Sequence, residues 1–285
     1  MSANTHGVCR LCGSKSQLLA SHIIPKFAIS WMKTTGTGYL RFIKTPNKRF
    51  QDGAKEKLLC LKCEQLLSSR ESYFASEVFK PMLAGATAVP YDQRLAYFVV
   101  SLLWRVLKVN LSELRRGAYP FLRQIERVER VWRHFLLNPL ELNHWPHLHI
   151  FVPDIADDNT PGGSGFNLYC MRALDATIFD RGACCYVFAK FVRFCFIAMI
   201  THYDEASWQN TRIVNGIGTL QIPQIINDVA FGGWLKDRAT FASKTFNAGV
   251  TSNQRSVIRN QVRRKLPTLQ NSDLLRASSA DQAGQ

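Results

Sequence analysis

Two pairs of cysteines with the same spacing occur in the first quarter of the chain. Cys9 and Cys12 form one pair, Cys60 and Cys63 form the other, and each pair encloses two residues. Two thiolates at this spacing reach one metal ion from a tight turn, and a second pair completes a tetrahedral four-sulfur site. Zinc in such a site stabilises a fold, because no coordination position is left open for a substrate. We therefore expect one structural Zn²⁺ ion bound by these four cysteines.

The alternative for a Cys-x-x-Cys pair is a redox-active dithiol. Two pairs within one stretch of 63 residues favour a metal site over a redox motif. The other four cysteines lie in apolar sequence without ligand spacing and are expected to be buried small hydrophobes: Cys170, Cys184, Cys185 and Cys195.

A histidine stands between the two cysteine pairs. His22 follows Ser21 and precedes an Ile-Ile-Pro segment, and a glycine, Gly13, follows the first cysteine pair, where a tight turn favours positive φ. The three segments resemble the motifs of the zinc-containing HNH endonucleases over about the first quarter of the chain: Cys9-x-x-Cys12-Gly13, Ser21-His22-Ile23-Ile24-Pro25 and Leu59-Cys60-x-x-Cys63.

This resemblance implies a treble-clef module of the ββα-metal type. In that family a hairpin and a helix hold one catalytic divalent ion, Mg²⁺ or Mn²⁺, beside the structural zinc. By position, His22 would be the general base that deprotonates the water attacking a phosphodiester, while the ion stabilises the charge and the leaving oxygen. Imidazole suits this role because it accepts a proton near neutral pH. The expected reaction is hydrolysis of DNA.

Three positions depart from the family pattern. Ser21 stands where the family has an Asp, Glu or His ligand, and a hydroxyl is a poor ligand for a hard dication. Glu64 follows the last cysteine and can supply a carboxylate in place of the usual Asn or His. Asp52 stands near the position of the family's middle Asn and can replace a lost ligand. We expect Glu64, Asp52 and Ser21 around the catalytic ion, with Glu64 catalytic and about 4–6 Å from His22.

Each of these residues also has a structural alternative. His22 could brace the hairpin, lie in the core or be a further zinc ligand. Glu64 could be a first-turn carboxylate that the helix dipole favours. Glu71 could brace the hairpin or pair with Lys26 or Arg41. The alternative function is therefore a non-catalytic, zinc-scaffolded nucleic-acid-binding or adaptor protein with a degenerate HNH site.

Positive charge is unevenly distributed along the chain. The formal net charge is +15, and it divides as +8 in residues 1–90, +4 in 91–150, −1 in 151–250 and +4 in 251–285. A polyanion that meets the metal module would produce this pattern, although a basic surface can also serve solubility. We expect double-stranded DNA as the partner, bound by residues 1–90 and by a row of three arginines on a C-terminal helix, namely Arg255, Arg259 and Arg263.

The distribution of apolar residues predicts an α+β protein. We expect an HNH-like zinc module over 1–85, a helical region over 86–146, an α+β domain over 147–272 and a disordered tail over 273–285. The helical region should contain two helices between residues 90 and 138, because Pro90 and Pro120 precede runs with helical periodicity.

The third region should be mainly an antiparallel sheet followed by helices. Phe, Tyr, Ile and Val are frequent in 147–153, 166–172, 185–200 and 211–220, which predicts strands. Helices are expected near 223–236, 237–247 and 253–270. This region has almost no net charge, so the 147–250 segment could bind a protein partner or associate with itself.

Composition predicts a soluble protein. The hydrophobic content of 46% can supply a core for 285 residues. Apolar runs such as Leu95–Trp104 are about half the length that a bilayer span needs. No signal segment opens the chain, so we expect a cytoplasmic protein without membrane association, in a compartment that keeps thiols reduced.

Overall fold

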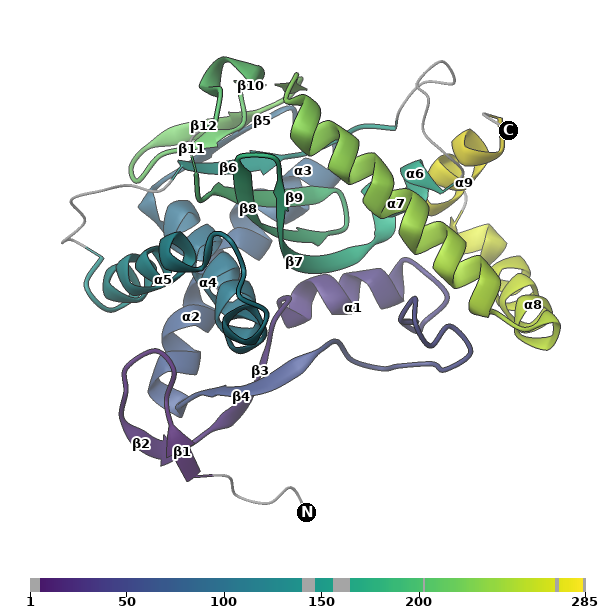
Figure 1. The fold of residues 1–285 in the computed structure, drawn as a ribbon. Coiled ribbons are helices and arrows are strands. Elements are labelled where there is room, and N and C mark those ends of the chain that lie inside the picture. Colours follow the sequence, from purple (N-terminus) through teal and green to yellow (C-terminus); the bar gives the residue numbers. More distant parts are fainter. Residues whose placement is uncertain (1–5, 140–146, 156–164, 202, 270–271, 284–285) are drawn as a thin grey trace.

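An antiparallel sheet of five strands lies between two helical layers, and the module with the two cysteine pairs is attached at one end (Figure 1). The structure is a computed structural model and describes residues 6–139, 147–155, 165–201, 203–269 and 272–283. This mixed architecture, with a C-terminal antiparallel sheet and helices, agrees with the α+β prediction.

Short strands and two helices form the N-terminal module. Strand β1 (His6–Val8) pairs with β2 (Lys15–Gln17), and β3 (Leu19–His22) pairs with β4 (Lys55–Leu59), both antiparallel. Helix α1 (Lys26–Thr34) follows β3 directly after Pro25, a residue that favours the first turn of a helix. Helix α2 (Leu61–Tyr73) begins immediately after Cys60.

The helix that carries the second cysteine pair is long. It continues from α2 through a π-helical segment (Phe74–Phe79) into α3 (Lys80–Leu83) and ends before Gly85, which has a φ of 100°. The two helices predicted between residues 90 and 138 are also present: α4 (Gln93–Arg116) and α5 (Leu122–Leu137). Asp92 caps α4 by accepting a hydrogen bond from the Arg94 amide at 2.8 Å.

Helix α4 is the central helix of the fold. It runs through 24 residues, most of which are buried, including the whole segment from Leu95 to Leu107. Among the described residues it is the one helix long and apolar enough to cross a membrane, and the same apolar surface is covered here by the sheet and by α5. The expected burial of Leu95–Trp104 is therefore confirmed.

The five-stranded sheet has the order β11-β6-β9-β8-β7. Its strands are β6 (His147–Phe151), β7 (Leu174–Arg181), β8 (Cys184–Phe191), β9 (Phe194–Met199) and β11 (Arg212–Ile213). Alternate residues of β8 face opposite sides, so that Val187 packs toward α4 and Phe188 toward α7 (Val229–Gly249). Both faces are therefore covered by helices (Figure 1).

Two further two-stranded ladders complete the strands of the described residues. Strand β5 (Ala88–Tyr91) pairs with β12 (Gly218–Gln221) and ties the helical region to the C-terminal region. Strand β10 (Trp208–Gln209) pairs with β13 (Ile225–Ile226), after a 3₁₀ turn over Glu205–Ser207.

Three local predictions were wrong. Residues 166–172, expected as a strand, form helix α6 (Phe166–Arg172), which packs against α7 and α9 (Asp273–Ala283). The single stretch 185–200 is a hairpin of β8 and β9. The two helices expected near 223–236 and 237–247 are one continuous helix, α7, which begins at Val229 and passes through Gly232 and Gly233; Ile225–Ile226 before it form strand β13.

The C-terminal tail is ordered where a disordered tail was expected. After α8 (Ser252–Leu269), residues Asp273–Ala283 form α9. Its Asp281 carboxylate accepts hydrogen bonds from the Asn167 and Leu168 amides, each 2.9 Å long, at the start of α6, and Ala277 is fully buried. A tail of small polar residues is thus held by capping and packing that its composition does not reveal.

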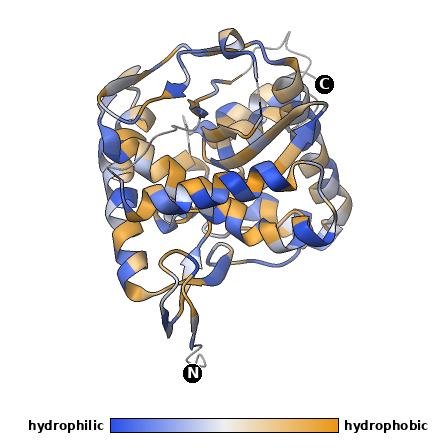
Figure 2. Ribbon diagram, turned by 60° about the vertical axis from the view of Figure 1, so that its left-hand side comes forward, coloured by the Kyte–Doolittle hydropathy of each residue, from blue (hydrophilic) through white to orange (hydrophobic). Residues whose placement is uncertain are grey.

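One hydrophobic core connects the cysteine module to the sheet. It extends from Cys9 and Cys63 through α4 to one face of β8 and β9, and a second cluster lies between the other face and α7. Figure 2 shows helices that carry both hydrophobic and hydrophilic residues, as expected for helices that pack on one side only.

A histidine is completely buried in strand β6. Both ring nitrogens of His149 form hydrogen bonds: Nδ1 with Thr211 Oγ1 at 2.8 Å and Nε2 with Tyr203 Oη at 3.0 Å. Burial lowers the pKa of His149 to about 3, and the charges of His147 and Arg212 act in the same direction. His144, which is close in sequence to His147 and His149, lies outside the described residues.

The buried imidazole makes a pH dependence of stability predictable. Unfolded His149 binds a proton below pH ~6.5, whereas the folded imidazole stays neutral to about pH 3, so the unfolded state binds more protons in this window. We expect the free energy of unfolding to fall by about 1.4 kcal/mol for each pH unit below 6.5 because of this residue. Urea denaturation at pH 7 and pH 5 measures this change in the free energy of unfolding. In His149→Gln the slope should flatten, whereas exposed His6→Gln should leave it unchanged; equal slopes in all three proteins would contradict the assignment.

Candidate functional site

The four cysteines of the two pairs converge at one point. Their sulfur atoms all lie within 4.8 Å of one another, and Cys12 Sγ is 3.8 Å from Cys60 Sγ. A tetrahedral ion with metal–sulfur bonds of about 2.3 Å would require sulfur–sulfur separations of about 3.8 Å. The four residues therefore fit a tetrahedral metal ion such as zinc, and the predicted assembly of Cys9, Cys12, Cys60 and Cys63 is confirmed.

The electrostatics of the cluster are those of a site that needs a cation. The Ser14 hydroxyl, 3.0 Å from Cys12 Sγ, lowers the pKa of the Cys12 thiol to about 6. Burial, together with the neighbouring thiols, raises the pKa of Cys63 well above its ordinary value. Four thiolates repel one another at these distances, so a bound dication is the physical means of ionising all of them.

Backbone geometry shapes both halves of the cluster. Gly13 has a φ of 81° and donates its amide to the Cys9 carbonyl at 2.9 Å, which closes the turn as expected for this glycine. In the other half, the Cys60 amide points at Cys9 Sγ at 3.4 Å. Arg133 of α5 donates to the Leu11 carbonyl at 2.5 Å, so the helical region supports the turn from outside.

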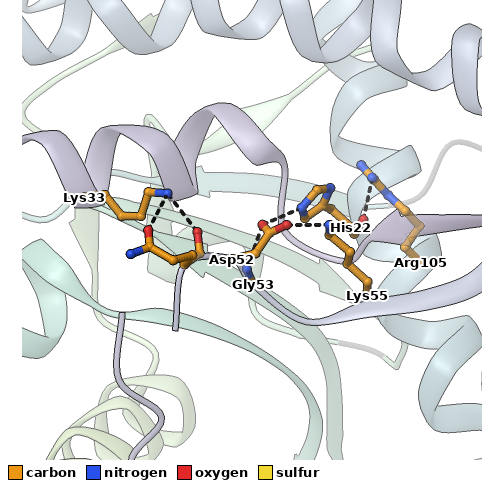
Figure 3. A network of polar contacts seen from close by, with 7 residues as sticks. His22, Lys33, Asp52, Gly53, Lys55 and Arg105 are labelled. Atoms are coloured by element: carbon orange, nitrogen blue, oxygen red, sulfur yellow. Dashed lines mark hydrogen bonds and ion pairs between the residues drawn. The ribbon is translucent and has the colours of Figure 1, made fainter. Parts of the chain in front are cut away.

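His22 lies at the end of β3, where it contacts a carboxylate. Its Nε2 is 2.7 Å from Asp52 Oδ1, and Lys55 binds the other carboxylate oxygen (Figure 3). Burial opposes the ionisation of Asp52, but hydrogen bonds from Lys55, His22 and the Gly53 amide outweigh it and hold the pKa of the carboxyl well below its usual range. Asp52 is therefore a fixed anion, and the His22 side chain, 15% exposed, can be reached by solvent.

The loop that carries Asp52 is braced from α1. Lys33 donates to the Gln51 carbonyl at 2.8 Å, and the Gly53 amide donates to Asp52 Oδ1 at 2.9 Å (Figure 3). These contacts fix the position of the Asp52 carboxylate next to His22.

Ser21 and Glu64 form a second, separate pair. The buried Ser21 hydroxyl donates to Glu64 Oε2 at 2.7 Å. Because consecutive residues of a strand point to opposite faces, this pair and the His22–Asp52 pair lie on opposite sides of β3. Among the described residues, the cysteine tetrad is the one set of three or more metal-binding side chains whose donor atoms converge, so His22, Asp52 and Glu64 do not form such a set.

A buried arginine that the sequence did not single out supports His22. Arg105 of α4 is only 2% exposed, and it donates to the His22 carbonyl at 2.8 Å (Figure 3). Its guanidinium also lies 2.6 Å from Glu71 Oε1. Glu71 therefore pairs with Arg105, and not with Lys26 or Arg41. The available signal was a lone cation within the buried helix face from Leu95 to Leu107.

Two basic segments that are distant in sequence meet beside α1. Asn47 accepts from the Thr251 amide at 3.0 Å and donates to the Gly249 carbonyl at 2.9 Å, and Arg41 donates to Gln254 at 3.3 Å. These contacts join the 39–53 loop to the start of α8 (Figure 1). Both segments carry exposed cations: Lys44, Lys48, Arg49, Arg255, Arg259 and Arg263.

Comparisons with protein-family models, curated proteins and solved structures found no match to this chain.

Proposed function

We propose that the chain is a zinc-scaffolded, HNH-like endonuclease that hydrolyses phosphodiester bonds in DNA. In this proposal the four cysteines bind one structural Zn²⁺ ion, and the β3–β4 ladder and α2 form a treble-clef module of the ββα-metal type. The observation that carries the proposal is the His22–Asp52 pair, an accessible imidazole held by an ionised carboxylate 2.7 Å away.

His22 is the proposed general base. With Nε2 engaged by Asp52, the neutral tautomer leaves Nδ1 to take a proton from water. Asp52 then stabilises the imidazolium that forms, as an orienting carboxylate does for other catalytic histidines. Arg105 fixes the backbone of His22 from α4 and is a positioning residue.

The catalytic ion of the proposal, Mg²⁺ or Mn²⁺, would supply charge stabilisation for the phosphate and the leaving oxygen. Glu64 is the carboxylate of α2 that would hold it, beside the Ser21 hydroxyl that hydrogen-bonds to it, whereas Asp52 stays with His22 on the other side of β3. Oxygen donors suit such hard cations.

A non-catalytic DNA-binding protein is the second candidate. One observation favours it: Glu64 accepts a hydrogen bond from Ser21, while Asp52 binds His22 and Lys55, so the carboxylates are engaged within the protein. In that case the cysteine cluster would scaffold a binding surface alone.

Nicking of a supercoiled plasmid distinguishes the two candidates. Purified protein incubated with Mg²⁺ or Mn²⁺ should convert the plasmid to the open-circular form, and EDTA should prevent this conversion. Protein that retards the plasmid on a gel, yet leaves it supercoiled with either ion, would support the non-catalytic candidate.

DNA binding should depend steeply on salt. Release of counterions from phosphates makes log K fall linearly with log salt concentration, with a slope of about −0.9 for each phosphate neutralised. Changing Arg255, Arg259 and Arg263 to Glu together should weaken duplex binding and make this slope shallower by up to about 3. Fluorescence anisotropy with a labelled duplex between 50 and 200 mM salt is a suitable measurement.

A second row of exposed arginines provides the matched control. Arg123, Arg127 and Arg130 lie on α5, away from the surface formed by the 39–53 loop and α8. Reversing these three charges changes the net charge equally and should have a clearly smaller effect. Equal losses for the two rows would show that overall charge, and not the proposed surface, governs binding.

A further inference from the structure

A cavity of about 460 Å³ lies at one end of the five-stranded sheet, remote in sequence from the cysteine module. Its walls come from the end of β6, the β8–β9 turn, α6 and α7, and they include Phe151, Phe166, Ile222 and Leu235. Its size is within the range of pockets that bind small molecules, and its walls are mainly apolar, as in such pockets.

Among the described lining residues of this apolar cavity, one is a cation. Arg193, in the β8–β9 turn, is 14% exposed, and its Nε atom is buried without a hydrogen-bond acceptor among the described residues. The nearest carboxylate oxygen, Asp154 Oδ1, is 3.9 Å from the guanidinium, and the Asp154 side chain is 74% exposed to solvent. Since a buried donor without an acceptor is costly, Arg193 is poised to bind an anion.

The amide side chain of the wall, Gln224, is already saturated. Gln224 accepts from the Val152 amide at 2.8 Å and donates to the carbonyls of Ile150 and Asn210 at 2.9 Å. These three bonds fix the wall and leave the amide little capacity for a ligand. Recognition of an anionic group in the cavity therefore depends on Arg193, the cation among its described lining residues.

We propose that this cavity binds a small monocarboxylate with an apolar body. A guanidinium matches the geometry of a carboxylate with two parallel hydrogen bonds, and the apolar walls would cover the rest of the ligand. The Asp154 carboxylate near Arg193 repels a second negative charge, which disfavours a phosphate dianion. The inference is independent of the proposed nuclease activity.

Calorimetric titration with octanoate tests the proposal on the full chain. Octanoate should bind, and octanamide, which has the same length but no charge, should bind at least tenfold more weakly. Arg193→Gln should lower the octanoate affinity at least tenfold and reduce this preference. Octyl phosphate should bind more weakly than octanoate.

Two further variants make the outcome independent of any folding defect in Arg193→Gln. Asp154→Asn removes the exposed carboxylate and should tighten octanoate binding several-fold, whereas Arg181→Gln, an exposed arginine outside the cavity, should change nothing. The proposal is wrong if octanoate shows no binding at millimolar concentration, if octanamide binds equally well, or if octyl phosphate binds more tightly.

Discussion

Replacing Cys60 by serine is expected to remove the bound zinc and destabilise the whole chain. A structural zinc ion contributes on the order of 10 kcal/mol to the folding of small zinc modules, and a hydroxyl replaces a thiolate poorly as a ligand. Because Cys9, Cys60 and Cys63 belong to the same core as α4, the loss should reach beyond the module. Elemental analysis should show one zinc per wild-type chain and nearly none in the variant, together with a lower Tm.

Cys184→Ser is the matched control for this experiment. Cys184 lies at the start of β8, away from the tetrad, and is only half-buried. Its replacement should leave the zinc content at one per chain. A Cys60→Ser protein with unchanged zinc content and melting behaviour would show that the tetrad does not bind the metal.

Replacing His22 by alanine should abolish most DNA cleavage while leaving DNA binding and zinc content intact. Loss of a positioned general base typically lowers a rate by about 10²–10⁴-fold, which corresponds to about 3–5 kcal/mol of transition-state stabilisation. Asp52→Asn should lower the rate less, because the imidazole remains but loses its ionised partner. Initial rates of plasmid nicking, measured at saturating Mg²⁺ or Mn²⁺, give these ratios.

His6→Ala tests whether the effect is specific. His6 is an exposed histidine in β1 of the same module, and its replacement should leave the nicking rate unchanged. Wild-type activity in His22→Ala would rule out the proposed base. A variant that loses zinc or DNA binding along with cleavage would instead indicate a structural role for His22.

The engagement of Glu64 can be tested separately. Glu64→Gln removes the one charged oxygen donor in the first turn of α2 and should raise the concentration of Mg²⁺ needed for half-maximal cleavage. Ser21→Ala removes the 2.7 Å hydrogen bond to this carboxylate. The two variants together distinguish Glu64 as a metal ligand from Glu64 as a hydrogen-bond acceptor of Ser21. If neither change alters the metal dependence, Glu64 has only a structural role in the module.

Features with a strong local signal were predictable from the sequence. The cysteine spacing identified the metal cluster, because ligand pairs must lie on tight turns to reach one ion. Periodic apolar residues identified α4 and α5, since helical periodicity directly reflects the buried face. His22 and Asp52 were both selected as site residues, although their direct contact was not expected.

Other features have no local signal. The β8–β9 turn occurs at Val192, with a φ of 54°, without the Gly or Asn that usually marks such a turn. Because these strands are buried on both faces, the alternation that separates strand from turn is also missing. Residues 166–172 similarly contain strand-forming residues but become helical where α7 and α9 cover them.

The sequence by itself determined which residues can hold a metal and which segments carry the charge, because these properties depend on residue type and short-range spacing. Only the tertiary structure decided how they are paired. Arg105 reaches His22 across 83 positions, and Asn47 meets Thr251 across 204. Such contacts depend on the packing of distant elements, which places Glu71 2.6 Å from the buried Arg105 guanidinium but leaves Arg193 Nε without an acceptor among the described residues.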